Sequence, residues 1–510
     1  MMNYYFEHKK RAFSPFILKG WVILVTLIFM VLPLRAQKNI LDRKYSFSFD
    51  SISVASFFDS LSTHYDIAFS YDASLIDSDS IFDARADSVQ LDQWLKKTFY
   101  QEELEIHQMD RQIIISSEPA RVNVESIHIK GLVVDSANQE PMDMVNIGIA
   151  GKSLGTASNR QGKFAFFLPA EYAGEKLVFS SLGYRRDSLA IPASDTSVVM
   201  TLSETSVELP EVLVKLVKPE EIMREVVRRK KDNYAENPLI MTAFFRESIQ
   251  QDKKYVDVSE AVVEIFKPPY FQEYALERVR FVKGRKGQYS GDMEMIDFKL
   301  QGGPFLFSRV DIVRQGGFLP DMAGNSVYKY SFKRMDYDHG RTVFVIGFEP
   351  YNDTGELLYE GEIVVDEASF AIVSATFQMT DKTVRKSREY LIRRDSRRFR
   401  TKPSFARYRI DYRPWNDKWI LNSVRGEVNM KVIDRQENIR TVFNTVSELL
   451  VTDLRTGDRK EFRWNDAFRA DYILSDQIEA YDDDFWSRYN IISPDESVEK
   501  IFEKQEGDEE

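Results

Sequence analysis

The sequence has 510 residues, of which 43% are hydrophobic and 13% aromatic, so it can build roughly three or four domains with cores of their own. Its formal net charge of −11 at pH 7 argues against nucleic acid as a partner. Because it contains no cysteine, it can form no disulfide and offers no cysteine for a lipid anchor.

Residues 1–36 are predicted to be a signal peptide. Four basic residues precede an apolar run at 21–34, which is shorter than the roughly 20 residues that a membrane span needs. We expect cleavage between Ala36 and Gln37. Leu34 would be the third residue before the cut, where a small residue is preferred, so an uncleaved anchor is an alternative. Cleavage would remove five basic residues and one acidic one and leave a net charge of about −15.

Residues 37–120 are predicted to form a small α+β domain of order β-α-β-α-β-β. We expect strands at 44–50 and 67–71, helices after Ser53 and at 91–99, and a hairpin of 104–109 and 112–116. An apolar stripe at i, i+3, i+4 and i+7 marks the first helix, and Ser53 is its candidate cap. The stripe comprises Val54, Phe57, Phe58 and Leu61, and the second helix has Leu91, Trp94 and Leu95 on one face.

Three segments of this domain, 57–61, 67–71 and 113–115, resemble the short N-terminal domain shared by secretins and TonB-dependent transducers. The resemblance covers about 70 residues. It implies a periplasmic domain that docks a protein partner. The stripe and Trp94 are interpreted as core, so the docking surface lies on other residues.

Residues 121–204 are predicted to be a β-sandwich. Val145, Ile147 and Ile149 alternate with polar or small residues, which is the period of a half-buried strand. We expect strands at 127–134, 145–149, 163–168, 177–180 and 198–202. Short strands at this spacing are typical of a sandwich.

The segments Gly131–Asp135, Gly155-Thr156, Asn159–Phe164 and Leu182–Tyr184, together with Pro141, resemble the carboxypeptidase-regulatory-like (transthyretin-type) domain of Gram-negative envelope proteins. The resemblance implies a non-catalytic spacer. A zinc carboxypeptidase needs a His and a Glu three apart and a distant His. No histidine of the chain has a Glu three residues on; the five are His8, His64, His107, His128 and His339.

Residues 205–238 are predicted to be a linker and a helix that begins at Pro219. Residues 239–464 are predicted to form a large antiparallel sheet that curls into an open half-barrel. We expect its strands at 240–249, 255–266, 328–337, 342–349, 361–365, 371–379, 404–412, 419–432 and 441–451. An outer-membrane barrel is the alternative, opposed by the arginine-rich stretch 385–400 and by the acidic C-terminus. The fold class is thus mainly β and multidomain.

Tyr359–Asp366 and Phe370–Val373 resemble a strand pair of the outer-membrane lipoprotein carrier class, which supports a half-barrel.

Residues 465–510 are interpreted as a C-terminal capping segment and acidic tail. Phe485, Trp486 and Tyr489 are expected to pack on the sheet. A short helix is expected to begin at Ser493-Pro494 and end near Phe502, with an unstructured acidic end.

Two groups could carry chemistry. Asp336–Gly340 gathers two carboxylates and His339, but a hairpin turn explains it better than a calcium loop does. Glu360 and Glu362 would point to one face of a strand, roughly 6–7 Å apart, a spacing at which an acid and a base could cleave a glycoside. No nucleophile turn of the Gly-x-Ser-x-Gly type is present.

The favoured hypothesis is a non-enzymatic periplasmic accessory protein, at the inner face of the outer membrane, that docks an envelope protein through residues 37–120. The alternative is a carrier or sensor of a lipid or other apolar ligand, held on the concave face of the half-barrel by aromatic residues of the range 240–450. A third hypothesis is a hydrolase that uses Glu360 and Glu362. No cofactor, metal, nucleic acid or membrane-spanning helix of the mature chain is expected.

Overall fold

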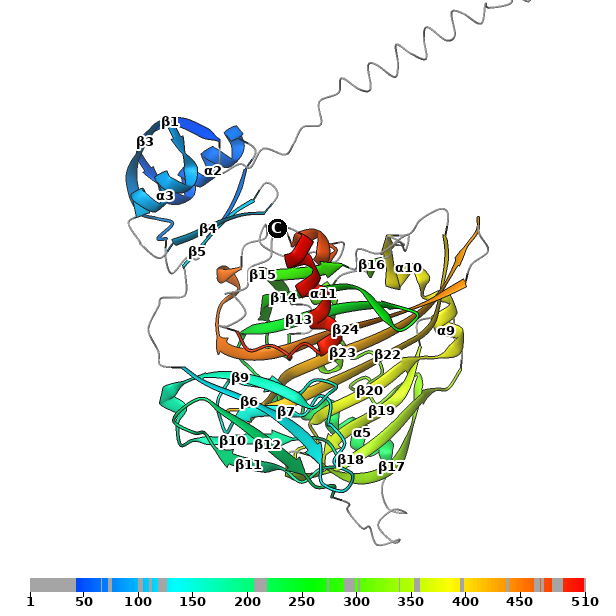
Figure 1. Ribbon diagram of the computed structural model, residues 1–510. Helices are drawn as coiled ribbons and strands as arrows, with labels where there is room; N and C mark the ends of the chain where they lie inside the picture. The colour runs from blue at the N-terminus through cyan, green and yellow to red at the C-terminus, as the bar shows by residue number, and fades with distance from the viewer. Residues whose placement is uncertain are drawn as a thin grey trace, which may run out of the picture. The chain divides into compact units, whose positions relative to one another are not determined.

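The computed structural model describes residues 43–65, 67–71, 76–99, 104–109, 112–117, 126–205, 218–272, 275–288, 299–300, 303–338, 340–352, 358–394, 399–436, 440–462, 468, 472–478 and 489–508. The predicted cleavage site at Ala36 and Gln37 lies outside these residues. Among the described residues, none of the helices has the length and hydropathy that a membrane crossing requires. The chain divides into two compact units, residues 1–118 and 119–510, which are described separately (Figure 1).

The first unit has one strand more than the sequence predicted, so its order is β-α-β-β-α-β-β. Its elements are β1 (Lys44–Ser53), α2 (Val54–Tyr65), β2 (Ala68–Tyr71), β3 (Ile81–Gln90), α3 (Leu91–Phe99), β4 (Leu104–Met109) and β5 (Gln112–Ser117). β1 pairs with β3, and β2, β5 and β4 form a second sheet. The pattern did not reveal β3 because only Ala84 of that strand is fully buried, and the charged residues around it hide the alternation.

The predicted core of this unit is confirmed. All four residues of the α2 stripe are buried, and the Ser53 hydroxyl accepts a hydrogen bond from the backbone N–H of Ser56 (3.2 Å) as an N-cap does. Trp94 packs edge-on against Phe47 of β1 and donates its indole N–H to the backbone carbonyl of Arg85 on β3 (3.1 Å). This tryptophan therefore ties both strands of the first sheet to α3.

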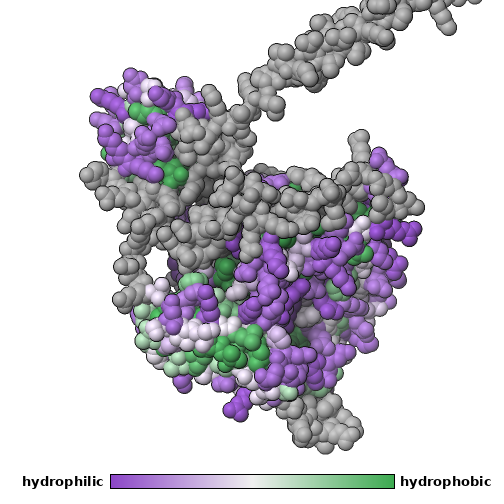
Figure 2. Space-filling model, in the orientation of Figure 1, coloured by the Kyte–Doolittle hydropathy of each residue, from purple (hydrophilic) through white to green (hydrophobic). Residues whose placement is uncertain are grey.

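The sandwich of the second unit consists of two sheets, and two of its short strands were not predicted. Its strands are β6 (Ser126–Asp135), β7 (Asn146–Ile149), β8 (Gly155–Ala157), β9 (Lys163–Pro169), β10 (Lys176–Ser180), β11 (Asp187–Ala190) and β12 (Thr196–Leu202), with the 3₁₀ turn η1 (Ala170–Tyr172) after β9. One sheet has the order β11-β10-β7-β8 and the other β12-β6-β9. Among the coloured residues of Figure 2, hydrophilic ones predominate, and a smaller hydrophobic area lies over the sandwich. β8 and β11 were not predicted because β8 has only three small residues and β11 is short and mostly polar.

Several residues of the predicted resemblance hold the sandwich together. A Cβ on Gly131 would lie 2.4 Å from the carbonyl of Val198, so no larger residue fits between β6 and β12. Asp135 accepts a hydrogen bond from the Tyr184 hydroxyl (2.7 Å). The Asn159 side chain accepts from the backbone N–H of Lys163 (2.9 Å) and so shapes the turn before β9. These residues act in folding.

The large sheet of the second unit has ten strands, each antiparallel to its neighbours (Figure 1). They are β13 (Leu239–Gln251), β14 (Lys254–Lys267), β15 (Arg278–Gln288), β17 (Tyr328–Asp338), β18 (Arg341–Pro350), β19 (Tyr359–Asp366), β20 (Ile372–Met379), β22 (Phe399–Trp415), β23 (Lys418–Asp434) and β24 (Arg440–Thr456). The order is β15-β14-β13-β24-β23-β22-β20-β19-β18-β17. The predicted open antiparallel sheet is thus confirmed, and the edge strand β15 is an addition.

The order shows two meanders joined in the middle of the sheet. The chain enters at β13, moves out to the edge at β15, crosses to the opposite edge at β17 and returns strand by strand to β24, which pairs with β13. The part of the chain between β15 and β17, which we call the crossing segment, includes β16 (Lys299–Leu300), α7 (Gly303–Arg309) and α8 (Ile312–Gln315). β16 pairs with the short β21 (Ile392–Arg394).

Both faces of the central strands are buried, so their residues do not alternate between apolar and polar. On β13, Phe245 packs against Phe307 of α7, whereas the adjacent Phe244 joins a cluster with Ala157 of the sandwich and Ile492. We call these the helix-covered face and the sandwich-covered face.

The predicted helix at Pro219 is α5 (Pro219–Arg228), which buries Ile222, Met223 and Val226 and is followed by α6 (Lys230–Asn233). Two more short helices, α9 (Asp381–Lys386) and α10 (Arg388–Leu391), follow β20.

The C-terminal segment joins the sandwich to the sheet. Asn490 hydrogen-bonds to both backbone groups of Phe167 on β9, and the backbone carbonyl of Ile492 accepts from the Arg246 guanidinium of β13 (2.7 Å). The helix that follows, α11 (Glu496–Asp508), runs beyond the predicted end at Phe502 into the acidic residues expected to be unstructured. Short 3₁₀ turns η2 (Arg459–Glu461) and η4 (Leu474–Gln477) precede it. Phe485 and Trp486 lie outside the described residues.

Candidate functional site

The candidate site lies where the crossing segment meets the helix-covered face of the sheet. α7 begins at Gly303, whose φ of +38° suits glycine, and Pro304 stands in the first turn, where its missing N–H costs nothing. Asp311 caps α8 by accepting from the backbone N–H of Val313 (3.2 Å), and Gly316 ends it with a φ of +73°. Local sequence thus defines two short helices that can lie across the strands.

A buried ionic network fixes the crossing segment to the sheet. Lys267, at the end of β14, lies 2.8 Å from Asp311 and 3.5 Å from Glu277, and all three side chains are fully buried. Arg314 of α8 lies 2.8 Å from the same Glu277 oxygen, and the Tyr412 hydroxyl of β22 donates to Asp311 (2.6 Å). Because a buried charge is costly unless it is paired, these contacts hold α8 in one position.

The network keeps the Asp311 carboxylate ionised. Burial by itself would raise the pKa of Asp311, but the Lys267 ammonium and the Tyr412 hydroxyl outweigh burial, and its pKa lies below the ordinary value. Burial and the charge of Asp311 raise the pKa of Tyr412 well above its ordinary value, so its hydroxyl keeps the proton that it donates. The crossing segment is therefore held by a charged network at neutral pH.

Between the crossing segment and the strands lies a cavity of 590 Å³, which we call the sheet cavity. Its lining residues come from the crossing segment, from α10 and from five strands: Glu247, Gly303, Leu306, Phe307, Arg309, Val310, Gln315, Tyr359, Tyr390, Leu391, Tyr408, Gly426, Val428 and Ser447. Four of them are aromatic residues of the range predicted to line such a cavity. The volume falls within the roughly 300–1,000 Å³ typical of small-molecule sites.

The walls of the sheet cavity are mainly apolar. Leu306 and Val310 of the crossing segment and Leu391 of α10 face it together with Val428 of β23. Burial raises the pKa of Tyr359 to about 12. Both Tyr359 and Tyr408 are therefore uncharged at neutral pH, since burial raises the pKa of Tyr408 as well. Such walls suit a hydrocarbon chain better than a charged substrate.

A few polar groups also line the cavity. Ser447 of β24 donates to the carboxylate of Glu247 on β13 (3.4 Å), and both residues are buried. Arg309 is half-exposed and lies 3.9 Å from Glu277 of the ionic network. These groups could orient the polar end of an amphipathic ligand.

The proposed catalytic pair does not lie at the sheet cavity. Glu360 and Glu362 flank Gly361 on β19, and the cavity residue Tyr359 precedes them, so they point to the opposite face. Gln378 donates to Glu360 (2.9 Å), and Arg334 lies 3.3 Å from Glu362. Each carboxylate thus pairs with a neighbour on the sheet.

The metal candidate at 336–340 is a hairpin turn, as the sequence favoured. Asp338 ends β17 opposite Arg341, and Gly340 has a φ of +79°. Asp336 lies 3.2 Å from Arg334, while His339 lies outside the described residues. Among the residues that the structure describes, no three His, Asp or Glu side chains gather in a way that could hold a metal ion.

The sequence pattern did not reveal the part of the site that comes from the crossing segment. Phe307 was not singled out, and the glycine pairs at 302–303 and 316–317 match no phosphate-binding motif. The available signal was Gly303-Pro304 followed by three apolar residues, 305–307, which is typical of a helix start.

The comparisons with known proteins identify the sandwich. Residues 129–214 match a family described as the CarboxypepD_reg-like domain, which confirms the resemblance predicted for this region. No curated protein matches the chain. The resemblance of residues 37–120 to the short N-terminal domain stays a prediction.

Two solved structures share distant similarity with the chain. One is a domain from Vibrio parahaemolyticus described as a candidate outer membrane lipoprotein-sorting protein, at 12% identity and a TM-score of 0.22, covering 49% of this chain and 97% of that one. The other is a DUF1329 family protein from Desulfovibrio piger, at 11% identity and a TM-score of 0.23, covering 49% of this chain and 99% of that one. At these scores neither supports an inference about this chain.

Proposed function

We propose that the protein is a non-enzymatic carrier or sensor that binds an apolar or amphipathic ligand, such as a lipid chain, in the sheet cavity. The observation that carries the proposal is the cavity of 590 Å³ between α7, α10 and the sheet, walled by Leu306, Val310, Leu391 and Val428. Burial of apolar ligand surface would supply roughly 25 cal/mol per Å² before the cost of association.

The first test is to purify the protein from residue 37, extract it with organic solvent and identify any lipid by mass spectrometry. We expect lipid in stoichiometric amount. The second test measures binding of a fluorescent fatty acid. Leu306→Glu places a charge in the cavity wall and should weaken binding about tenfold or more.

The matched control is Leu276→Glu, because Leu276 is 58% exposed and does not line the cavity. It makes the same change in charge and composition without touching the walls. A protein that carries no lipid and binds the fatty acid equally well in both variants would refute the carrier proposal.

A second function, docking of an envelope protein through residues 37–120, rests on the independence of the first unit. Its buried cluster is drawn entirely from residues 45–115, with Phe57 and Leu61 among its most buried members. A part with its own core can bind a partner without the sheet. Crosslinking in cells should capture an envelope protein that is lost on deletion of residues 37–120, and an unchanged set of partners would refute docking. Periplasmic location at the outer membrane, also proposed, is tested by fractionation of the same cells.

A further inference from the structure

A second cavity lies beside β22, where the neighbouring strand ends early. β22 has 17 residues and β20 has 8, and their ladder reaches only Arg407–Asp411 of β22. Residues 400–404 are thus free of β20, and α9 and α10 pack beside them instead. These helices, the free stretch of β22 and residues at the end of β23 line a space of 760 Å³, and we call it the basic cavity.

The basic cavity concentrates positive charge in an acidic protein. Six of its eleven lining residues are cationic, and one is a carboxylate: Arg385, Arg388, Arg400, Lys402, Lys431, Arg435 and Asp381. The chain as a whole has a net charge of −11. Lysine and arginine account for only 69 of the 510 residues, so this cavity is enriched in cations relative to the chain. The local electrostatic field therefore favours an anion.

The two lysines of the cavity lie where their like charges repel. Lys402 of β22 and Lys431 of β23 are direct partners in the antiparallel ladder, so their Cβ atoms lie about 4.5–5.5 Å apart. Both are exposed, and neither forms an ion pair with any carboxylate that the structure describes. Opposed like charges destabilise a sheet, and an anion bound between them would remove that cost.

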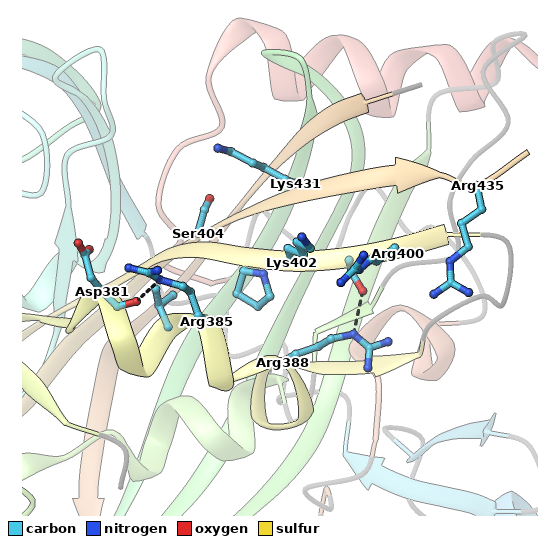
Figure 3. A pocket seen from close by; sticks show the side chains of 11 residues that line it. Asp381, Arg385, Arg388, Arg400, Lys402, Ser404, Lys431 and Arg435 are labelled. Carbon is cyan, nitrogen blue, oxygen red and sulfur yellow. Dashed lines mark hydrogen bonds between the residues drawn. The ribbon is translucent and has the colours of Figure 1, made fainter. Parts of the chain in front are cut away.

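The cavity is built from ordered elements. Figure 3 shows Arg385 and Arg388 along one side of β22 and Lys431 and Arg435 along the other. Arg388 donates to the Thr401 hydroxyl (3.2 Å), and Arg385 donates to the backbone carbonyl of Asp381 (2.9 Å). These contacts aim the guanidinium groups before any ligand arrives.

Protection of a strand edge explains only part of this arrangement. Charged residues and prolines commonly keep a free edge from pairing with another chain, and Pro403 serves that purpose on β22. Edge protection requires neither cations on α9 and α10 nor Lys431, which lies on the next strand. It also works with carboxylates, so it does not account for a single sign of charge.

We propose that the basic cavity binds a phosphate-bearing group with several negative charges. Guanidinium groups bind phosphate oxygens through paired hydrogen bonds, and lysines act as point charges. The group is either a soluble polyphosphate or the phosphorylated head of a lipid. This inference stands on the cations alone and does not depend on the sheet cavity.

The test is calorimetric titration of the protein from residue 37 with sodium tripolyphosphate and, separately, with short-chain phosphatidic acid kept monomeric, in 0.15 M salt. We expect saturable binding of at least one probe. The double variant Lys402→Glu and Lys431→Glu should weaken that binding about tenfold or more. The control Lys176→Glu with Lys254→Glu changes the net charge equally at exposed positions that do not line the cavity, and should bind as the parent does.

The two probes also separate the two sources of phosphate. If the group is the head of a lipid, phosphatidic acid binds more tightly than tripolyphosphate. If it is a soluble polyphosphate, tripolyphosphate binds more tightly. Absence of binding of both probes, or an equal loss in both charge variants, would overturn the proposal and leave edge protection as the role of the cations.

Discussion

The Lys267 ammonium lies 2.8 Å from the Asp311 carboxylate, and both side chains are fully buried. Lys267 ends strand β14, and Asp311 caps helix α8 of the crossing segment, so this ion pair joins the sheet to the segment that walls the sheet cavity. Lys267 also donates to the backbone carbonyl of Ser308 (2.9 Å) at the end of α7. A single lysine therefore positions both helices of that segment.

Asp311→Ala should destabilise the protein by about 3–5 kcal/mol, because it leaves the Lys267 charge buried with only Glu277 near it. Urea unfolding measures the change. The control is Glu349→Ala, which removes one partner of an exposed ion pair with Lys329 and should change the free energy of unfolding far less. Equal losses in the two variants would show that the buried network does not hold the crossing segment.

The hydrogen bond from Tyr184 to Asp135 predicts a pH-dependent stability. The Tyr184 hydroxyl, followed by the backbone N–H of Ala137, lowers the pKa of Asp135 below its ordinary value. A carboxyl whose pKa is lowered on folding contributes stability above its unfolded pKa, and this contribution disappears as pH falls through the folded pKa. The destabilisation caused by Tyr184→Phe should thus be largest above about pH 5 and shrink below about pH 4.

Thermal melts from pH 2 to pH 8 test this expectation. Tyr172→Phe is the control, because Tyr172 packs against the same sandwich core without a hydrogen bond to Asp135. Its effect on the melting temperature should not change over this range. A Tyr184→Phe effect that is equally large at pH 2 and pH 7 would contradict the proposed linkage.

The sequence predicted those features that depend on local pattern. The α2 stripe beginning at Val54 repeats with helical period and is buried as expected, and the antiparallel hairpins of the large sheet follow from strand-like runs divided by turns. The pairing of β13 with β24 was not predicted, because it joins residues about 200 positions apart and no local pattern encodes it. β3 and β15 were missed because charged residues interrupt their apolar residues.

The candidate sites were predicted in part. Aromatic residues such as Tyr359 and Tyr408 were expected to line a cavity of the sheet, and they do. The crossing segment was not foreseen as its wall, because its placement depends on the buried pair of Lys267 and Asp311, which are 44 residues apart in the sequence. The arginine-rich stretch 385–400 was seen only as an obstacle to membrane insertion. Lys431 lies close to this stretch only because β22 and β23 pair in the observed register, which the sequence pattern does not encode.

Gly426→Ala should damage the sheet cavity. A Cβ on Gly426 would lie 2.7 Å from the ring of Phe307, so α7 or the ring must shift. We expect a loss of about 1–3 kcal/mol in stability and weaker binding of a fluorescent fatty acid. Gly317→Ala is the control, since no atom lies within 4 Å of the place that its methyl group would take, and its stability should change by less than about 0.5 kcal/mol. Unchanged fatty acid binding in Gly426→Ala would place the ligand elsewhere.

Asn490 closes the exposed edge of the sandwich. β9 is an edge strand, and the Asn490 side chain accepts from the backbone N–H of Phe167 (2.8 Å) and donates to its carbonyl (3.0 Å), as a neighbouring strand would. Asn490→Ala leaves both groups without this partner and should cost about 1–3 kcal/mol. Hydrogen exchange at the Phe167 amide should accelerate, while exchange in β13 should not. Asn490→Asp keeps the acceptor but loses the donor, so an intermediate effect is expected, and exchange at Phe167 as slow as in the parent would show that the side chain does not protect this edge.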